Sequence, residues 1–547
     1  MSSPIKNIVV VMLENRSYDN VLGWLYNGSN QPPYRTAPSG QHNLQGLTGT
    51  ETNPGPGGTT VSISNAAATT VPAVDPGELF SDMAQQIYGT VETTNPYGNP
   101  PAQADAMQGF VNNYSGQPGV QDVGDCMTYL TPDQAPVSAW LANNFAVCDQ
   151  WYASVPCQTF TNRVFAVCGA PAVGQTMIFG KPLGGPYSMV DDLQYAAINA
   201  VWLETPVIKT AKYIVLPCVY QALDYYFGTS DIPNWKVYFS DYSIAALTVP
   251  YVYQAAISSS NVNVATYDNS DWSVGSYPIP ALIGDPLGAV PSTFVEDVAQ
   301  GTLPALSFIE PRYAADVAES SLEPNCNHPG NSKLTSLLPG PNSPIDVANG
   351  EAFLAEIYNL LRASRYWDQT LLIITYDEHG GVYDHMPPVG MTPPGAAITP
   401  GGGTPPIPIP VANDITDSTA DGFRFNYSGC RVPAIIVSPY IEAGTTIAPC
   451  GSVPFDHTSI IRTAWDIFGL PSGESLTQRD LNAPSLNSHL TSTPANTTGQ
   501  YSGPLSAARP TTAAAQPPNA GAKTPEERQA LFNARLDKSK RGGGASA

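Results

Sequence analysis

Residues 371–381 read LLIITYDEHGG and carry the strongest structural signal in the chain. A short, continuous apolar run is typical of a strand buried on both faces, as in a parallel sheet. This run ends in two carboxylates, an imidazole and a pair of glycines. Ligands of open α/β sheets bind just beyond the carboxyl ends of the strands. The stretch therefore predicts an α/β fold with a functional site at this edge, the alternative being an acidic turn after a core strand.

A second apolar run, IVVVML at residues 8–13, ends in a similar way, with Glu14 and Asn15. If the two strands are neighbours in one parallel sheet, these side chains meet Asp377 and Glu378 at the same edge. Four oxygen-bearing side chains suit a hard divalent cation, whose identity the sequence leaves open. The plainer alternative is that Glu14 and Asn15 only form a turn after the strand.

The composition narrows the classes of partner. The chain has 547 residues, of which 42% are hydrophobic, and a net charge of -22 at pH 7. This charge disfavours nucleic acid and anionic membrane surfaces. No apolar run is long enough to predict a transmembrane segment. The N-terminus lacks the pattern of a secretory signal peptide, so we expect a cytoplasmic location or export by another route. Eight cysteines without C-x-x-C spacing argue against structural zinc and leave disulfides open.

Strand and helix patterns alternate along the chain, which favours one large catalytic α/β domain over residues 1–490. Segments rich in Gly and Pro near 27–75 and 386–420 are expected to be insertions. Residues 491–547 have the composition of a low-complexity tail, with a possible short helix at 524–541. Strands are expected at 5–13, 235–239, 303–309, 371–376 and 433–438, and helices at 78–88, 135–145, 159–168, 346–366 and 457–468.

Thr159 stands where a helix is expected to begin. The N-terminus of a helix favours an alkoxide and an incoming phosphate through its free N–H groups and its dipole. A nearby metal would also lower the pKa of a hydroxyl that contacts it. Thr159 is therefore a candidate nucleophile for phosphoryl transfer. Two alternatives stay open: Thr159 is a plain N-cap, or Cys157 is the nucleophile, because a cysteine at a helix start can be reactive.

Three histidines are candidates for proton transfer or phosphate contact: His328, His379 and His457. Each of two histidines has a structural alternative to a catalytic role: His328 is an ordinary loop residue, or His457 lies at the capped start of a helix without contacting the substrate. His385 follows Asp384 and is expected to orient the neighbouring loop. The chain lacks the G-x-S-x-G motif and the nucleotide-binding glycine motifs, which favours phosphoryl transfer over acyl transfer.

Four stretches, in order along the chain, resemble the motifs of the phosphoesterase family, which contains bacterial phospholipases C and related acid phosphatases. They are ENRSYDNVLG at 14–23, the segment from CDQWY at 148–152 to TFTNR at 159–163, TYDEHGGVYDHMPP at 375–388, and residues 431–440 with DHTSI at 456–460. The likeness runs from about residue 5 to 470 and is absent from the tail.

The resemblance implies an alkaline-phosphatase-like α/β/α sandwich with a central, mostly parallel sheet and loop insertions. It also implies a metal-dependent phosphoester hydrolase. Carried over by position, it assigns Glu14, Asn15, Thr159, Asp377 and Glu378 to the metal and Thr159 to nucleophilic attack. It assigns His328 and His457 to the phosphate, and His379 to proton transfer or phosphate contact. Independently of the resemblance, Asn162 and Arg163 lie one turn after Thr159 in the expected helix, so Asn162 is expected to donate a hydrogen bond to the substrate phosphate, and Arg163 to do the same or to serve only as support.

Two departures from the family pattern concern the substrate. Residues 75–78 read D-P-G-E, so Glu78 stands where relatives often have a histidine. A carboxylate cannot give a phosphate a positive charge, so Glu78 is expected to influence substrate choice. His328, in N-H-P-G at 327–330, lacks the second proline of the family's H-P-P segment.

The sequence thus predicts a phosphoric ester hydrolase of the phospholipase C type, which cleaves a phosphodiester through a threonine nucleophile. Its substrate is expected to be a phosphoester, with a phospholipid as one candidate. The nearest alternative is an acid phosphatase acting on phosphomonoesters. A less favoured alternative is a catalytically silent binding protein of the same fold.

Overall fold

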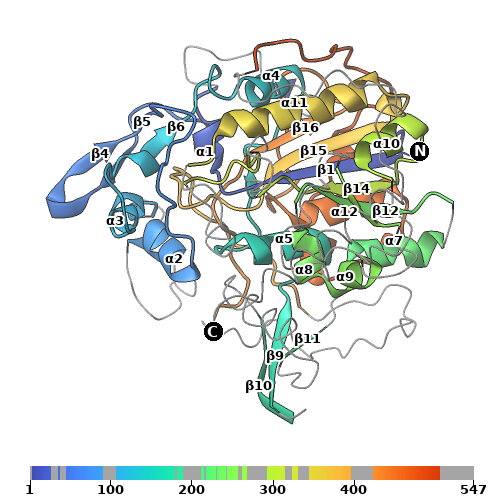
Figure 1. The fold of residues 1–547 in the computed structure, drawn as a ribbon, viewed down its shortest axis with the longest axis horizontal. Helices are drawn as coiled ribbons and strands as arrows, with labels where there is room; N and C mark the ends of the chain where they lie inside the picture. The colour runs from blue at the N-terminus through green and yellow to red at the C-terminus, as the bar shows by residue number, and fades with distance from the viewer. Residues whose placement is uncertain are drawn as a thin grey trace, which may run out of the picture.

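The computed structural model describes residues 3–25, 35–36, 45–89, 106–178, 181–188, 211–214, 217–228, 231–241, 243–256, 262–267, 292–313, 323–330, 344–395 and 423–505. Its centre is a nine-stranded sheet (Figure 1). The strands lie in the order β13 (Val264–Thr266), β12 (Trp235–Phe239), β14 (Leu306–Ile309), β1 (Asn7–Leu13), β15 (Thr370–Tyr376), β16 (Ala434–Val437), β7 (Ala146–Val147), β17 (Thr445–Thr446) and β2 (Arg35–Thr36). Of these nine strands, β16 alone runs against its neighbours.

The middle of the sheet is apolar on both faces. Every residue of β1, β14 and β15 is buried. A strand with two covered faces needs apolar side chains at successive positions, which is why these segments show no alternation. The continuous apolar runs therefore predicted buried parallel strands correctly.

Helices cover both faces of the sheet (Figure 1). One face carries α4 (Pro136–Asn144), α10 (Phe294–Gln300) and α11 (Val347–Ala363), and the other carries α5 (Thr159–Cys168), α7 (Val219–Phe227), α8 (Ile244–Thr248), α9 (Pro250–Ala256) and α12 (Thr458–Ile467). Their apolar sides and the strands form one large core. The predicted α/β/α sandwich with a central, mostly parallel sheet is confirmed.

A smaller lobe lies beside the end of β1, next to α1 (Tyr18–Val21) (Figure 1). It contains β3 (Thr52–Pro54), β4 (Thr60–Ser62), β5 (Ser64–Asn65), β6 (Thr128–Tyr129), α2 (Phe80–Tyr88) and α3 (Phe110–Ser115). The lobe has an apolar cluster of its own. Part of the predicted 27–75 insertion is thus the β3–β4 hairpin, whereas 396–422 in the second insertion and the helix expected at 524–541 lie outside the described residues.

The remaining elements are short or stand apart from the main sheet. They are β8 (Trp151–Tyr152), β9 (Val173–Ile178), β10 (Lys181–Ser188), β11 (Ala211–Ile214), β18 (Phe455–Asp456), α13 (Gln478–Leu481), and the 3-10 turns η1 (Pro56–Gly58), η4 (Asp125–Met127), η8 (Trp367–Gln369) and η10 (Leu486–His489). Predicted helices and strands occur where expected, with ends shifted by a few residues. The helix expected from residue 78 begins at Phe80, because Asp82 accepts a hydrogen bond from the N–H of Leu79 and closes the first turn.

Residues 491–505, which composition assigned to the tail, dock against α11. The Tyr358 hydroxyl donates to the carbonyl of Gly499 at 2.6 Å, and the Asn359 side chain exchanges two hydrogen bonds with the backbone of Tyr501. Tyr501 is buried as part of the main core. This stretch therefore packs as an extension of the domain beyond residue 490.

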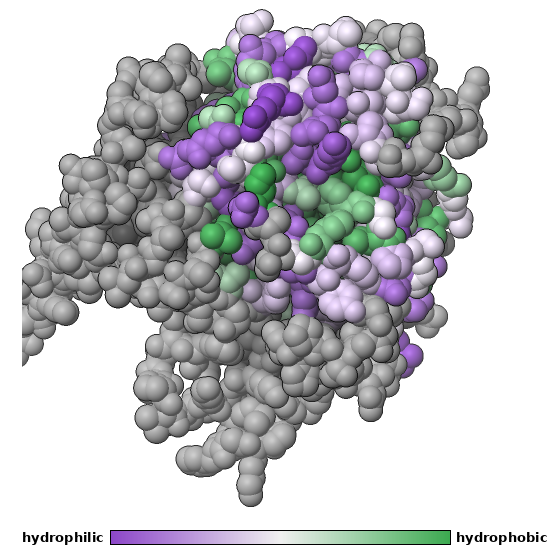
Figure 2. Space-filling view, turned by 90° about the vertical axis from the view of Figure 1, so that its right-hand side faces the viewer, coloured by the Kyte–Doolittle hydropathy of each residue, from purple (hydrophilic) through white to green (hydrophobic). Residues whose placement is uncertain are grey.

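The side of the molecule where the strands begin carries apolar surface. Figure 2 looks onto this side, which bears α7 and α10, and shows apolar side chains in its middle with polar ones around them. Because β1 runs from here towards α1, this surface lies away from the carboxyl edge of the sheet. Among the described helices, none is long and apolar enough to cross a membrane.

Candidate active site

The prediction that the strands before Glu14 and before Asp377 are parallel neighbours in one sheet is confirmed. β1 and β15 pair in parallel, with Leu13 opposite Tyr376. The next residues, Glu14 and Asp377, therefore leave the sheet together at its carboxyl edge. The backbone N–H of Asp377 donates to the Leu13 carbonyl at 3.2 Å, and both acidic side chains are buried. The strand register thus joins two motifs that are far apart in the sequence.

Asn15 lies at the centre of this edge. Its backbone has a φ of 60°, and its N–H donates to Oδ1 of Asp377 at 3.0 Å. The Nδ2 of Asn15 donates to Oε1 of Glu78 at 2.7 Å, which leaves Oδ1 of Asn15 to face the hydroxyl of Thr159 at 3.3 Å. A Cβ on Gly380 would come within 2.1 Å of the Asn15 carbonyl oxygen, so the approach of the two loops requires glycine there.

Thr159 is the first residue inside α5, and Gln158 is the N-cap. The interpretation of Thr159 as a plain N-cap is therefore wrong. The Thr159 hydroxyl donates to the Asn15 side chain at 3.3 Å. The side chain is 4% exposed, so little solvent competes for it. The hydroxyl is thus held at the carboxyl edge, beside the motif that follows β1.

Asn162 holds the loop that precedes Thr159. Its Nδ2 donates to the carbonyls of Val155, Cys157 and Gln158 at 3.2, 2.8 and 3.2 Å. Its Oδ1 accepts from the N–H of Val155 at 3.0 Å. Asn162 was predicted to bind substrate; in this structure its amide is occupied by backbone and fixes the position of Thr159.

Arg163 forms hydrogen bonds to the ends of both central strands, β1 and β15. Its Nε donates to Oδ2 of Asp377 at 3.0 Å, and one Nη donates to the carbonyls of Met12 and Leu13 at 3.1 and 3.2 Å. The other, Nη1, has no hydrogen-bond partner within the described part of the chain. Arg163 was also predicted to bind substrate, and Nη1 is the atom that could do so.

Glu14 supplies the clearest sign that a cation fits here. Its Oε2 is buried and accepts no hydrogen bond from any described residue. Burial, and then the neighbouring Asp377, raise the pKa of Glu14 well above its ordinary value. A buried carboxylate oxygen without a donor is costly unless a cation or a proton offsets it. The oxygens of Glu14, Asn15 and Asp377 therefore fit a hard divalent ion.

A second group of possible ligands adjoins Asn15. Ligand atoms of Asp75, Glu78 and His328 lie within 4.8 Å of one another, close enough to share an ion. The Nε2 of His328 is 3.3 Å from Oε1 of Glu78, and its Nδ1 donates to the Pro329 carbonyl at 2.7 Å. Sequence reasoning did not assign Asp75 to the site, although the D-P-G-E segment that contains it was a usable signal.

His457 has both ring nitrogens engaged by the protein. The indole N–H of Trp151 can only donate, and it lies 3.3 Å from Nδ1 of His457. Nε2 must therefore carry the proton, which it donates to the Asp377 carbonyl at 2.6 Å. Burial lowers the pKa of His457 to about 4, so the ring is neutral. This geometry orients the Asp377 backbone; the predicted contact of His457 with phosphate stays a prediction.

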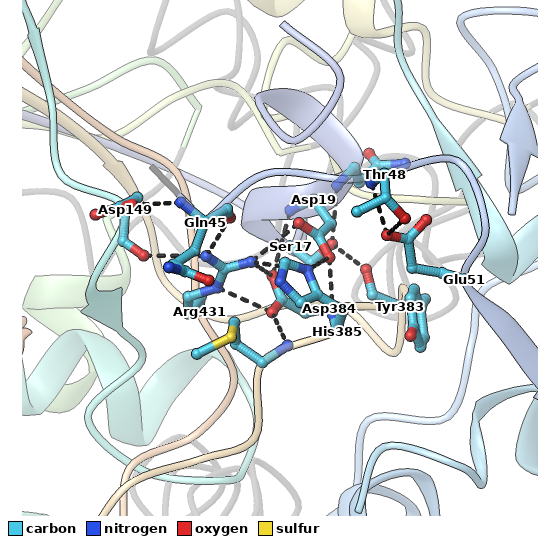
Figure 3. A network of polar contacts seen from close by, with 12 residues as sticks. Ser17, Asp19, Gln45, Thr48, Glu51, Asp149, Tyr383, Asp384, His385 and Arg431 are labelled. Carbon is cyan, nitrogen blue, oxygen red and sulfur yellow. Dashed lines mark hydrogen bonds and ion pairs between the residues drawn. The ribbon is translucent and has the colours of Figure 1, made fainter. Parts of the chain in front are cut away.

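A buried ion-pair network joins three of the sequence motifs (Figure 3). Arg431 makes two hydrogen bonds to Asp384, at 2.9 and 3.2 Å, and one to Asp19 at 2.9 Å. The Nδ1 of His385 lies 2.6 Å from Asp19. These contacts fix the loop after Glu378, as expected for His385. Because the Arg431 guanidinium already occupies the space between the two carboxylates, we assign no cation to this cluster.

Cys157, the alternative nucleophile, is buried in the smaller apolar cluster. Its Sγ is directed to the Gln158 carbonyl at 3.9 Å. All eight cysteines are free thiols in this structure. The hydroxyl of Thr159, which faces Asn15, is the better placed of the two candidates.

The structure thus brings most of the predicted residues to one edge. Glu14, Asn15, Asp377 and Glu378 follow β1 and β15, Thr159 begins α5, and Glu78 and His328 adjoin Asn15. Gln86, which contacts Nε2 of His379 at 2.9 Å, was missed. Nothing in its local sequence, on the amphipathic helix α2, distinguishes it from a surface glutamine.

The model of the phosphoesterase family matches residues 5–471. Non-specific phospholipase C6 of Arabidopsis thaliana is 31% identical, over 89% of this chain and 73% of that protein. Non-specific phospholipase C1 of the same plant is 30% identical, over 88% and 70%. Phospholipase C B of Mycobacterium tuberculosis is 23% identical, over 88% and 77%.

A solved structure, the lipoteichoic acid synthase LtaP from Listeria monocytogenes, aligns with 64% of this chain and 70% of that chain. The TM-score is 0.29 and the identity 13%, so this likeness carries no argument about function.

Proposed function

Because the chain belongs to the phosphoesterase family, we propose that it is a metal-dependent phosphodiesterase of the phospholipase C type, with Thr159 as its nucleophile. Hydrolysis of a phosphoric ester follows from the family and from relatives that align over most of the chain. Three further features are proposed here: a phosphodiester as the substrate, a bound divalent metal, and Thr159 as the nucleophile.

The observation that carries the proposal is the contact between Thr159 and Asn15. The Thr159 Oγ1 lies 3.3 Å from the Asn15 Oδ1 at the edge of the sheet. Asn162 fixes the loop that precedes Thr159, and the hydrogen bond to Asn15 orients the Thr159 hydroxyl. A nucleophile that is positioned in advance gains rate because little entropy is lost on reaching the transition state.

The side chains that would hold the metal are Glu14, Asn15, Asp377 and Glu378, with Thr159 at its side. A divalent ion there would supply positive charge that favours the alkoxide form of a hydroxyl and offsets the charge of a phosphate. The Oε2 of Glu14, which has no hydrogen-bond partner among the described residues, supports this assignment. Arg163 would keep Asp377 in place through its Nε.

The reaction would proceed by double displacement. The Oγ1 of Thr159 gives up its proton to water and attacks phosphorus, and the bond to the leaving alcohol breaks. The phosphoryl group, still carrying the second ester group of the diester, is then joined to Thr159. Water hydrolyses this intermediate, which releases a phosphomonoester and restores the Thr159 hydroxyl. His328 is best suited to give the leaving alcohol its proton. Its Nε2 lies 3.3 Å from Oε1 of Glu78, which is bonded to Asn15, so the ring stands next to the proposed nucleophile.

Glu78 favours a diester over a monoester. Its Oε1 is bonded to Asn15, so an additional carboxylate stands next to the proposed nucleophile. A phosphomonoester carries up to two negative charges and a diester only one, so the monoester suffers the greater repulsion. Relatives named as phospholipases C make a phospholipid the first diester to test.

The test compares a chromogenic phosphodiester, a chromogenic phosphomonoester and phosphatidylcholine vesicles. Each is assayed with native protein, with chelated protein and after a single divalent metal is restored. We expect diester and lipid turnover that chelation abolishes and metal restores. Faster turnover of the monoester would favour the acid phosphatase, and full activity without metal would overturn the metal dependence.

A further inference from the structure

Cys450, in the loop between β17 and β18, is the exposed thiol among the eight cysteines of the chain, and the other seven are buried. Burial raises the thiol pKa of six of these seven, which are Cys126, Cys148, Cys168, Cys218, Cys326 and Cys430. Since the thiolate is the nucleophile, a buried cysteine whose thiol pKa is raised is inert. A dissolved reagent is therefore expected to react at Cys450.

His489, the last residue of η10, lies beside this thiol. Its side chain is 8% exposed, and its Nε2 is 3.6 Å from the Sγ of Cys450. Its Nδ1 is buried and has no hydrogen-bond partner in the described part of the chain. The ring packs against Phe455 with the ring centroids 5.9 Å apart, and the N–H of Leu486 anchors η10 to the Thr463 hydroxyl on α12 at 2.9 Å. The imidazole is thus held in place next to the exposed sulfur.

The contacts of His489 indicate which ring nitrogen carries the proton. Burial lowers the pKa of His489 to about 4, so the ring is neutral at pH 7 and has one N–H group. A proton on Nδ1 would be a buried donor without an acceptor among the described residues, and such donors are rare in folded proteins. A proton on Nε2 faces the sulfur of Cys450 instead. The geometry therefore favours Nε2 as a hydrogen-bond donor to Sγ.

Ser488, the other polar neighbour of the thiol, has the opposite role. Its hydroxyl donates to the Ser485 carbonyl at 3.1 Å, which uses its proton. The Ser488 Oγ lies 3.6 Å from the Sγ of Cys450, so it can only accept from the S–H group. When the thiol loses its proton, the N–H of His489 still faces the sulfur. A donor in that position stabilises the negative charge of a thiolate through a charge-assisted hydrogen bond.

We propose that Cys450 is a modification site, at which a small disulfide forms a mixed disulfide with a thiolate that the Nε2–H of His489 stabilises. The thiol of Cys450 gives its proton to water, and the thiolate attacks one sulfur of the small disulfide, whose S–S bond breaks. The departing sulfur leaves as a thiolate and takes a proton from water, so a free thiol is released and no other oxidant is consumed. This inference does not depend on the proposed phosphodiesterase activity.

The first experiment measures the second-order rate at which the folded, full-length protein reacts with dithiodipyridine at neutral pH. This disulfide is uncharged, so the net charge of -22 does not repel it. The matched control is the double variant Cys450→Ser, Ser452→Cys, which moves the thiol to an exposed position in the same loop. Wild type should react at least about tenfold faster than this control, because its thiolate is stabilised. Peptide mass spectrometry should find the modification on Cys450.

The second experiment removes the N–H group and keeps the packing. His489→Phe preserves a ring against Phe455 but has no donor, so its rate should fall to within about threefold of the control thiol. Ser488→Ala removes the acceptor of the thiol proton and should not slow the reaction. Melting temperature and near-ultraviolet circular dichroism report whether each variant is folded. His489→Leu makes the same test without a ring and replaces His489→Phe if that variant is unfolded.

Three results would overturn the inference. If wild type reacts no faster than the control thiol, Cys450 is an ordinary exposed cysteine. If a folded variant without the His489 imidazole reacts as fast as wild type, the imidazole does not stabilise the thiolate. If the modification is found first on one of the buried cysteines, Cys450 is not the reactive thiol of the folded protein.

Discussion

The backbone N–H of Asn15 donates a 3.0 Å hydrogen bond to Oδ1 of Asp377, which lies 362 residues later in the chain. The same carboxylate accepts from Nε of Arg163 through Oδ2. Asp377 therefore connects the ends of the two central strands to the helix that begins at Thr159.

Asp377→Asn should reduce both metal content and turnover. The amide removes a negative charge from the proposed ligand set and turns an N–H₂ group towards Arg163, where the wild type offers an acceptor. Metal stoichiometry by elemental analysis and turnover of a diester provide the measurement. Asp368→Asn, the same change at an exposed position before β15, is the control. Unchanged metal content in Asp377→Asn would show that Asp377 is not a ligand.

Thr159→Ala should lower turnover by roughly three or more orders of magnitude, the scale seen when a nucleophile is deleted. Thr159→Ser keeps the hydroxyl and should retain measurable activity. Because Gln158 is the N-cap, the loss cannot come from a missing helix cap. Acid trapping followed by mass spectrometry should find on Thr159 a phosphoryl group that still carries the remaining ester group of the diester. Phosphate on Cys157, or normal turnover of Thr159→Ala, would contradict the mechanism.

Glu78→Gln should raise the ratio of monoester to diester turnover about tenfold. It keeps an acceptor for Asn15 but removes a charge several Å from the substrate, which is worth about 1 to 3 kcal/mol at an effective dielectric constant of ~20. Glu78→His should move the ratio in the same direction. The matched control is Glu323→Gln, at an exposed position. An identical ratio in all variants would mean that residue 78 does not act on the substrate.

Glu351 should make stability depend on pH. It lies on α11, and its carboxylate accepts from the N–H groups of Val137 and Ser138 at the start of α4. Burial raises its pKa from 4.5 to about 7 in the folded state. The folded protein therefore holds a proton that the unfolded chain releases. This stabilising contribution is complete below pH 4.5 and is lost as the pH rises through 7.

Denaturant unfolding of wild type and Glu351→Gln across pH 4 to 8 measures that contribution. The stability of wild type relative to the variant should fall over this range by at most about 3 kcal/mol, since one pKa unit corresponds to ~1.4 kcal/mol. Glu356→Gln, on the same helix, should show no such trend relative to wild type. A constant difference between wild type and Glu351→Gln would exclude the role of Glu351.

Truncation after Leu490 should destabilise the protein by at least about 2 kcal/mol, because it removes the buried Tyr501 ring and its contacts with α11. Truncation after Leu505 keeps these contacts and should preserve melting temperature and turnover. Differential scanning calorimetry of both variants distinguishes the two boundaries. Equal stability of the two truncated proteins would show that residues 491–505 do not belong to the domain.

The sequence alone determined the central sheet and most of its helices. The runs at residues 8–13 and 371–374 are apolar at every position. Such a run is typical of a strand whose two faces are both covered by other layers. Polar residues directly after such strands must lie at the sheet edge. The local sequence pattern was therefore enough to place Glu14, Asn15, Asp377 and Glu378 at the edge of the sheet, and to predict that a helix begins at Thr159.

Only the tertiary structure decided what each polar side chain does there. Asn162 looked like a substrate ligand but bonds to its own loop, and His457 has Trp151 on one ring nitrogen and a backbone carbonyl on the other. Gln86 gave no sequence signal, and Arg431, although it begins one of the family-like stretches, gave no sign of its partners Asp19 and Asp384. Hydrogen-bond partners are set by directions and distances between segments hundreds of residues apart. A sequence pattern predicts which face of a strand or helix a side chain occupies, but not which atom it contacts. The hydrogen-bond partners of these side chains could therefore be identified only from the tertiary structure.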